Sequence, residues 1–484
     1  MARTHASHAW NTGSIPVGAT SVRTLWGSNF FCINAPIFFL TTISAQDYSY
    51  DKTGLPVCYI TTKDNVSIDS KEYYVPAVIK IIQDDKLLLP DSEINIRVRG
   101  NATSNYPKKP YKIKFLKKNS PFPGMNKDKS FVLLANYTDR SLMNTAIGFK
   151  IGSLLDNGWV PNSEFVEVVV NGEFLGNYQL TEDVKSGKSR VDIADSGFLI
   201  EFDFDYKSSQ HYFATYYNNW FFTFKYPDDD EMLEKNFNDA KECMDRLETA
   251  IYSNEFPDTR LYTNLIDVES FAKWYYQKNL LQMDECNRYY LKKDDAQETK
   301  LQMGPLWDFE WCLGNAGNRI SPKHYLENKL YFAQLCKDDE FMRSVALIHS
   351  SYGDKIYSEI MSYYDILAGS LKKSQYENFK RWKILDLPIA LSTMPLGSWE
   401  KEVEYSRCFF TTHYKWLDQE LSKYLLDTAI IEFEADKSNL SPEIYNVSGQ
   451  KLNSVPEIHG IYIIDGKKFT LPALQKYLSD FYSW

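Results

Sequence analysis

The hydrophobic periodicity of this chain changes close to Asp230, and the change limits the folds open to it. Before that point short runs alternate apolar and polar residues, as in INIRVRG at 94–100, which is the period of a strand with one buried face. After it, apolar residues recur at helical spacing, as in NLIDVESFAKWYYQKNLLQM at 264–283. Strands followed by helices predict an α+β fold.

The first part is predicted to be a β-rich sheet with one prominent helix. Asn171-Gly172 is a strong two-residue hairpin turn inside the longest strand segment. The helix is expected to start at Ser141, whose side chain caps it, and to run to Asp156. The predicted strand segments share high Val, Ile, Tyr and Phe content and lie at 56–62, 74–83, 94–98, 111–115, 131–139, 164–184, 197–206 and 220–227.

The domain organisation is predicted in three parts. A leader occupies 1–45, and a large domain at 46–428 divides into a β-rich N-lobe, about 56–228, and a helical C-lobe, about 229–428. Residues 429–484 contain short apolar runs with Ser-Gly and Asp-Gly turns, which indicates a small appended β module. With 484 residues and 44% hydrophobic content, the chain can bury a sizeable core.

Charge and cysteine content exclude some classes of protein. A net charge of −10 argues against nonspecific nucleic-acid binding, so no nucleic-acid partner is expected. The seven cysteines include no C-x-x-C pair, which makes zinc ribbons and thioredoxin-like redox chemistry unlikely.

The N-terminal residues indicate export. Residues 1–27 are poor in acidic side chains and read as a leader of foreign origin. The apolar run from Phe30 to Ile43, followed by Ser44 and Ala45, resembles a signal peptide, and a buried strand or helix is the alternative. The run is too short for a confident membrane span, and no other stretch could form one. We therefore expect an exported protein, periplasmic, cell-surface or extracellular, with no stable transmembrane segment.

Acidic residues in an apolar setting mark the strongest candidate site. Asp308 and Glu310 stand among Trp and Phe in KLQMGPLWDFEWCLGN, 300–315. A buried carboxylate needs a metal ion, a basic side chain or a backbone donor, although a structural Asp that caps a turn is the alternative. Asp284 and Asn287 lie upstream, and the order Asp, Asn, strand, Asp is that of kinase-like sites.

A basic hairpin is the second candidate. The segments INIRVRG and YKIKF (111–115) place basic side chains on one strand face, among them Lys112 and Lys114, and a polar loop joins the two. Such a hairpin could hold the phosphates of a nucleotide, and a solvated hairpin face is the alternative.

Four ordered motifs resemble one family. RVRGNATSNYPKKPYKIKF, LLANYTDRSLMN, GEFLGNYQLTEDV and GPLWDFEWCLGN are similar to motifs of the CotH-type (spore coat protein H) kinases, and the resemblance covers roughly 56–425. It implies a bilobal protein-kinase-like fold. It also implies transfer of the γ-phosphoryl group of ATP, with Mg²⁺ or Mn²⁺, to serine or threonine hydroxyls of secreted or surface proteins.

The resemblance assigns roles to particular residues. Asp284 takes the role of catalytic base, while Asn287, Asp308 and the longer carboxylate Glu310 are candidate metal ligands. Lys112 or Lys114 would neutralise the α/β-phosphates, with Glu182 as the partner of that basic side chain. The remaining cofactor contacts are Arg99 and Asn101 over the phosphates, and the backbone of Leu199 to Glu201 at the adenine edge.

Departures from the family pattern leave two alternatives open. Met143 precedes Asn144 where the family has Arg, Glu310 replaces the second Asp, and no Gly-rich loop is present. The chain could therefore be a pseudokinase that binds nucleotide without turnover. It could also be a non-catalytic surface adhesin or a glycan-associated binding protein, since its aromatic content of 15% suits glycan contact as well as core packing.

The C-terminal segment IYNVSGQKLNSVPEIHGIYIIDGKKF resembles the terminal β modules of exported proteins from Bacteroides-like bacteria. In that group such modules act as sorting signals or stalks. The residues after Leu471 do not follow the pattern.

Overall fold

The computed structural model describes most of the chain from Tyr48 onward. Asp284 and Asn287, the predicted base and metal ligand, lie outside the described residues, as does the signal-peptide-like segment. The described residues are 48–203, 211–228, 233–283, 288–315, 329–389, 394–431, 444–446, 450–452, 461–464 and 467–482.

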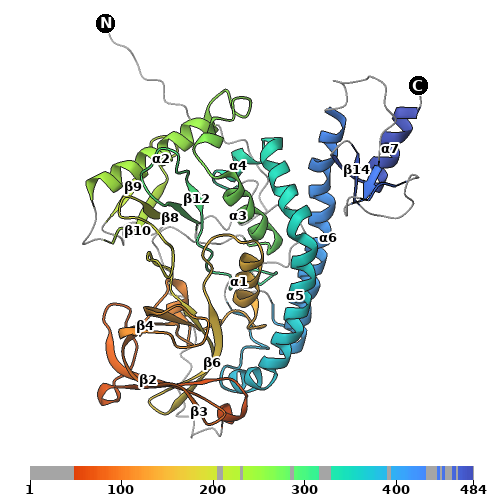
Figure 1. The fold of residues 1–484 in the computed structure, drawn as a ribbon. Helices are drawn as coiled ribbons and strands as arrows, with labels where there is room; N and C mark the ends of the chain where they lie inside the picture. The colour runs from red at the N-terminus through yellow and green to blue at the C-terminus, as the bar shows by residue number, and fades with distance from the viewer. Residues whose placement is uncertain are drawn as a thin grey trace, which may run out of the picture. The chain divides into compact units, whose positions relative to one another are not determined.

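The first part of the chain forms a closed β-barrel, drawn from red to yellow in Figure 1. The strand order is β1-β2-β3-β4-β5-β7-β6, and a parallel pairing of β1 with β6 closes it. Closure leaves no unpaired sheet edge in this part of the molecule. The strands are β1 (Val57–Thr62), β2 (Val75–Gln83), β3 (Lys86–Val98), β4 (Tyr111–Asn119), β5 (Asp128–Leu134), β6 (Ser163–Val170) and β7 (Glu173–Glu182).

Apolar and polar side chains alternate along the strands, which places the apolar ones inside the barrel. Ile96 on β3 pairs with Ile113 on β4, and both side chains are fully buried, while Arg97 pairs with Lys112 on the outer face. The predicted Asn171-Gly172 turn is confirmed between β6 and β7, where both residues have positive φ, 51° and 82°.

A second sheet of five strands contains segments from both sides of the predicted lobe boundary at residue 228. Its order is β12-β11-β8-β10-β9, so β8 lies between β10 and β11. The strands are β8 (Phe198–Phe202), β9 (Tyr212–Ala214), β10 (Phe221–Tyr226), β11 (Arg288–Lys292) and β12 (Gln302–Met303).

Helices make up most of the remaining chain, as the periodicity predicts. The two long helices α5 and α6 lie side by side (Figure 1). The last turns of α5 also contact the barrel, where Trp382 Nε1 donates to the Leu175 carbonyl on β7 at 2.8 Å. The helices are α1 (Asn144–Leu154), α2 (Glu234–Tyr252), α3 (Val268–Leu280), α4 (Phe332–Leu335), α5 (Asp339–Arg381) and α6 (Trp399–Ile431).

The C-terminal segment contains a small sheet of three strands among the described residues. Strands β13 (Ile444–Asn446), β14 (Ile461–Ile464) and β15 (Lys467–Thr470) pair antiparallel. Helix α7 (Leu471–Tyr482) follows, in the stretch that departs from the resembling pattern, and Leu474 joins a small core with these strands.

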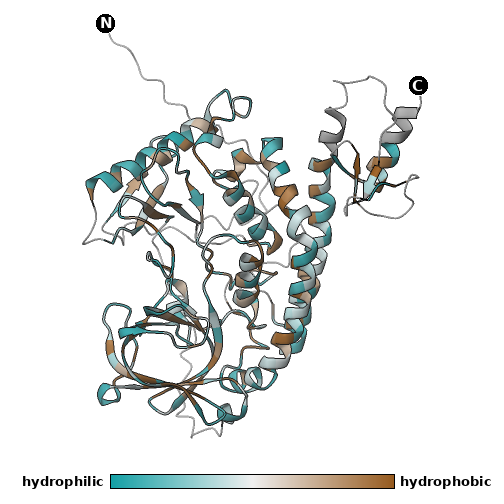
Figure 2. Cartoon of the chain, in the orientation of Figure 1, coloured by the Kyte–Doolittle hydropathy of each residue, from teal (hydrophilic) through white to brown (hydrophobic). Residues whose placement is uncertain are grey.

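The fold is therefore the mixed α+β fold that the sequence predicts, whereas the closure of the first sheet into a barrel is new. The two-lobed kinase arrangement stays a prediction. Hydrophobic and hydrophilic segments alternate along α5 and α6 in Figure 2. Within the part of the chain that the structure describes, no helix has the length and apolar character needed to cross a membrane.

Candidate active site

The acidic motif forms an irregular loop after β12. Trp307 and Phe309 are buried, 5% and 0% exposed, while Asp308 between them is exposed. Asp308 has a left-handed backbone, φ 66°, a conformation that Asp adopts more readily than most residues other than glycine. The two aromatic side chains anchor the loop, and the carboxylate between them is left at the surface of a cavity.

Two glycines of α1 let this loop approach the helix closely. A Cβ atom at Gly148 would stand 2.3 Å from Cγ of Phe309, and one at Gly152 would stand 2.4 Å from Cδ1 of Leu306. Such distances are far below van der Waals contact, so any larger residue at either position would push the acidic loop away.

Among the described residues, neither a hydrogen bond nor an ion pair reaches the carboxylate of Asp308. The surrounding protein displaces water from Asp308, and this desolvation raises the pKa of its carboxyl group above the ordinary value. The positive charges of Arg99 and Lys278 oppose the rise. Asp308 is nevertheless an exposed residue that lines a cavity, so it does not belong to the core.

A cavity of about 50 Å³ adjoins Asp308. Ligand pockets usually measure roughly 300–1,000 Å³, so this space suits an ion or the end of a larger ligand. Its walls come from the loop after β3, the loop after β5, α1 and the acidic loop, with Arg99, Thr103, Tyr106, Lys108, Pro110, Leu134, Ala135, Asn136, Tyr137, Thr145, Trp307, Asp308, Phe309 and Glu310.

Glu310, a predicted metal ligand that also lines the cavity, joins two loops. Its Oε1 accepts hydrogen bonds from the backbone N–H and the hydroxyl of Thr138, each at 2.6 Å. Burial raises the pKa of Glu310, and these two hydrogen bonds oppose that rise. The longer carboxylate thus reaches the loop after β5 and fixes it to the acidic loop.

The loop between β5 and α1 contributes further polar groups that the sequence did not assign. Asp139 accepts hydrogen bonds from the N–H groups of Ser141 and Asn144, at 2.9 and 2.8 Å. Asn144 is the first residue of α1, so the carboxylate of Asp139 caps the helix, where the sequence predicted the Ser141 side chain. Burial raises the pKa of Asp139 to about 7. The Asn144 side chain donates to the carbonyls of Glu310 and Cys312, which fastens α1 to the acidic loop.

Of the residues predicted to contact phosphate, Arg99 alone lines the cavity. Its guanidinium lies 5.6 Å from the centroid of the Trp307 ring. Asn101 and Lys114 are exposed outside the cavity lining. Lys112 forms an ion pair with Asp183 at 2.8 Å.

The acidic partner of Lys112 differs from the prediction by one residue. Glu182 is fully buried and pairs with Arg190 at 3.0 Å, while its other oxygen accepts from the Asn162 N–H. Burial alone would raise the pKa of Asp183, but the charge and hydrogen bond of Lys112 hold it below its ordinary value. Glu182 is therefore a structural carboxylate, and the expected pairing of Glu182 with Lys112 or Lys114 is wrong.

The predicted adenine contact at Leu199–Glu201 is also corrected. These residues lie on β8 and pair with β10 on one side and β11 on the other. Ladder hydrogen bonds therefore occupy their backbone groups, which cannot meet an adenine edge as a kinase hinge does. The Glu201 side chain pairs with Lys225 at 2.7 Å, and burial raises its pKa, with the charges of Asp203 and Asp308 adding to the rise.

Two buried lysines near the site, Lys108 and Lys278, were not predicted from the sequence. Lys108 Nζ donates to the Ala135 carbonyl at 2.7 Å, to Asn378 Oδ1 on α5 at 2.9 Å and to the Asn177 carbonyl, and burial lowers its pKa to about 7. Lys278, near the end of α3, lies under the acidic loop with Nζ 3.4 Å from the Trp307 carbonyl.

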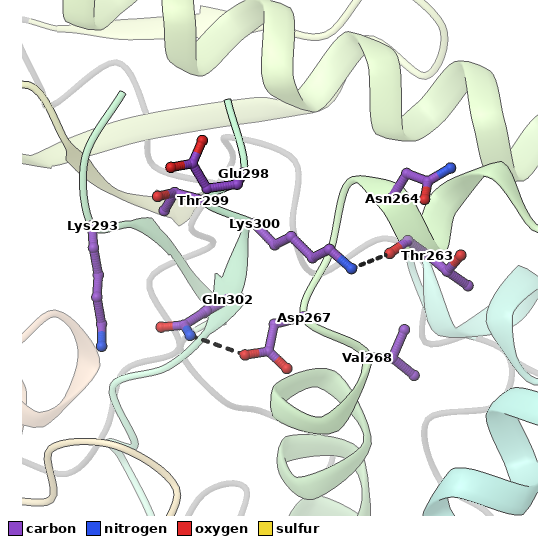
Figure 3. Close-up of a pocket in the computed structure, with 9 residues that line it drawn as sticks. All are labelled: Thr263, Asn264, Asp267, Val268, Lys293, Glu298, Thr299, Lys300 and Gln302. Atoms are coloured by element: carbon purple, nitrogen blue, oxygen red, sulfur yellow. Dashed lines mark hydrogen bonds between the residues drawn. The ribbon is translucent and has the colours of Figure 1, made fainter. Parts of the chain in front are cut away.

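A larger cavity, of about 570 Å³, lies away from these residues (Figure 3). It is lined by the turn that joins β11 to β12 and by the start of α3. In it Lys300 donates to the Thr263 carbonyl at 2.7 Å, and Gln302 donates to Asp267 at 3.0 Å. Lys300 and Gln302 line this cavity, whereas Asp308 and Glu310 do not.

A family model for the CotH kinase proteins matches residues 96–417. The chain belongs to the CotH kinase family. The match covers about two thirds of the chain, from β3 into α6, and includes every residue of the cavity beside Asp308. No curated protein matches the chain.

Membership of a kinase family implies ATP and a divalent metal ion at the level of the family. Magnesium prefers oxygen ligands, and Asp308 offers carboxylate oxygens that face the cavity. Among the described side chains no group of three or more His, Cys, Asp or Glu could hold a metal ion. Asp308 therefore fits the ion as one ligand, and Glu310 lines the same cavity.

Proposed function

We propose that this CotH kinase family member is an exported atypical protein kinase. It transfers the γ-phosphoryl group of ATP, with Mg²⁺ or Mn²⁺, to serine or threonine hydroxyls of secreted or surface proteins. The observation that carries the proposal is the carboxylate of Asp308, which is open to solvent and faces a cavity lined by Arg99.

The chemistry asks the protein mainly to position charged groups. Phosphoryl transfer needs an oriented hydroxyl, cations around the phosphates and little covalent participation by the protein. The divalent ion supplies neutralisation of phosphate charge when it is bound. Asp308 would hold that ion together with Asn287, and Asp284 would orient the incoming hydroxyl and accept its proton.

Arg99 is the side chain best placed for phosphate. Its guanidinium lies beside Trp307, next to the residue that would bind the metal, and its charge acts on Asp308. A planar guanidinium can donate two parallel hydrogen bonds to phosphate oxygens. Lys112, by contrast, is already paired with Asp183, so we assign Arg99 rather than Lys112 to the phosphates.

Export and the identity of the acceptor rest on the sequence. The apolar run from Phe30 to Ile43 with its small-residue site supports passage across a membrane. An exported kinase acts on proteins that share its compartment or its export route, which is why secreted or surface proteins are the proposed acceptors.

The test is incorporation of label from γ-labelled ATP into the protein itself and into casein, with Mg²⁺ or Mn²⁺. We expect label with the wild type and at least a hundredfold less with Asp308→Asn, an isosteric change that removes the metal-binding charge. Asp239→Asn on α2 is the matched control, since this carboxylate is 38% exposed and pairs with Lys235, and it should retain full activity. Equal labelling by Asp308→Asn and the wild type would refute the assignment of Asp308.

A pseudokinase is the second candidate, and Glu310 favours it, because this residue stands where the family has its second Asp and is bonded to Thr138. With or without turnover, a nucleotide does not fit the space of about 50 Å³ beside Asp308 unless the surrounding loops move. If ATP raises the melting temperature of the wild type but no label is transferred, the protein binds nucleotide without turnover.

A further inference from the structure

Lys278 is a buried ammonium group directly beneath the acidic loop. It lies in the last turn of α3 and is 0% exposed. Its Nζ lies 4.2 Å from the centroid of the Phe309 ring and 5.6 Å from that of Trp274. It also lies 3.4 Å from both the Trp307 carbonyl and the Met283 sulfur. Lys278 therefore touches the residues on both sides of Asp308.

A fully buried ammonium needs compensation for the water it has lost. A carbonyl, a thioether and aromatic faces compensate part of that loss, since each presents negative electrostatic potential to a cation. The charge of Lys278 also acts favourably on the carboxylate of Asp308. The arrangement thus sets a positive charge next to the proposed metal ligand.

We propose that Lys278 is a positioning residue that serves as a built-in counter-cation of the nucleotide site. It balances the charge of Asp308 while the site is empty, and it selects the polyanionic nucleotide with its metal over the free metal ion. This inference rests on the proposed function, because it concerns the same site.

The sign of the electrostatic interaction decides which ligand Lys278 favours. A fixed positive charge close to Asp308 repels a free divalent cation and attracts the phosphates of ATP. Removing it should therefore strengthen binding of the metal alone and weaken binding of the nucleotide. A residue that merely held the loop in shape would weaken both when it is replaced, so the two effects are separable.

The experiment compares the full-length wild type with Lys278→Met, which has similar length and no charge. Binding of Mn²⁺ without nucleotide is followed by electron paramagnetic resonance, and binding of ATP in saturating Mg²⁺ is followed by calorimetry. For one unit charge on a side chain that contacts both neighbours of Asp308, we expect about tenfold tighter Mn²⁺ and about tenfold weaker ATP.

Two further variants control for folding and for charge. Lys273→Met is the matched control, because Lys273 lies on the same helix, is 7% exposed and pairs with Glu269 rather than with the acidic loop. It should leave both affinities unchanged. Lys278→Arg keeps the charge and should restore affinities close to those of the wild type. Thermal unfolding of each variant shows that the compared proteins are folded.

The outcomes separate this inference from the proposed function. Unchanged or weaker Mn²⁺ binding by folded Lys278→Met overturns the role of Lys278, even if the wild type is an active kinase. Opposite shifts in the two affinities support it, even if the wild type transfers no phosphate. A wild type that binds neither Mn²⁺ nor ATP overturns both proposals.

Discussion

Replacing Gly148 on α1 tests whether the close packing of Phe309 against this helix positions Asp308. The substitution Gly148→Ala adds one methyl group, whose carbon would stand 2.3, 2.6 and 2.7 Å from three ring atoms of Phe309. The nearest distance is about 1.2 Å shorter than the roughly 3.5 Å at which carbon atoms normally touch. Phe309 is 0% exposed, so its ring has little room to retreat.

Two opposing effects determine how Gly148→Ala changes the free energy of unfolding. Alanine is favoured over glycine inside a helix by about 1 kcal/mol. Overpacking a filled core costs about 1–3 kcal/mol. The net change in the free energy of unfolding for Gly148→Ala is therefore a loss of about 0–2 kcal/mol, together with displacement of Phe309 and hence of Asp308.

Gly369→Ala provides the matched control for this prediction. Gly369 lies inside α5, and no atom lies within 4 Å of a Cβ built there. The same methyl group should stabilise the protein by about 1 kcal/mol at this position. Urea denaturation of both variants, with the midpoint and slope measured, gives the comparison. If Gly148→Ala gains as much stability as Gly369→Ala, the packing of Phe309 against α1 is wrong.

Two further predictions concern groups with shifted pKa values. Asp183→Asn should lower the free energy of unfolding by about 1–3 kcal/mol at pH 7, because it removes the ionic bond with Lys112. The pKa of Asp183 is lowered in the folded protein, so the stabilities of wild type and variant should converge as the pH falls through that pKa. Urea titrations from pH 7 to pH 3 measure this convergence. Burial lowers the pKa of Lys108 to about 7, so the unfolded chain holds more protons there between that pH and about 10.4, and stability due to Lys108 should rise with pH across this window. Lys108→Met should abolish the rise, and an unchanged slope of the urea midpoint against pH would contradict it.

Local sequence signals predicted the strands and the helices well, because both depend on short-range periodicity. The Asn171-Gly172 turn requires positive φ at both positions, and few other dipeptides accept that geometry. Closure of the barrel could not be predicted in the same way. It depends on the pairing of Val57 with Glu167, which are far apart in the chain, and no local pattern encodes such a contact.

Only part of the site could be predicted, because burial of a side chain also depends on contacts between distant parts of the chain. The setting of Asp308 among aromatic residues marks it locally, whereas Lys278 and Lys108 carry no local mark of burial. A lysine in an amphipathic helix or a polar loop normally faces solvent, and only the tertiary packing turns these two inward. Glu182 and Asp183 are adjacent, and the sequence alone did not tell which of them would face Lys112.

The state of Asp308 is best understood by comparison with the acidic residues around it. Glu310 accepts two hydrogen bonds from Thr138, Asp139 caps α1, and Glu201 pairs with Lys225. Each therefore has a specific partner within the described residues, and each can be explained by stability alone. The carboxylate of Asp308 has no such hydrogen bond or ion pair in the same part of the chain, although two aromatic neighbours anchor it firmly. A fixed carboxylate that is left without a bonded partner beside a cavity adds little to folding, so its position is best explained by a ligand that binds there.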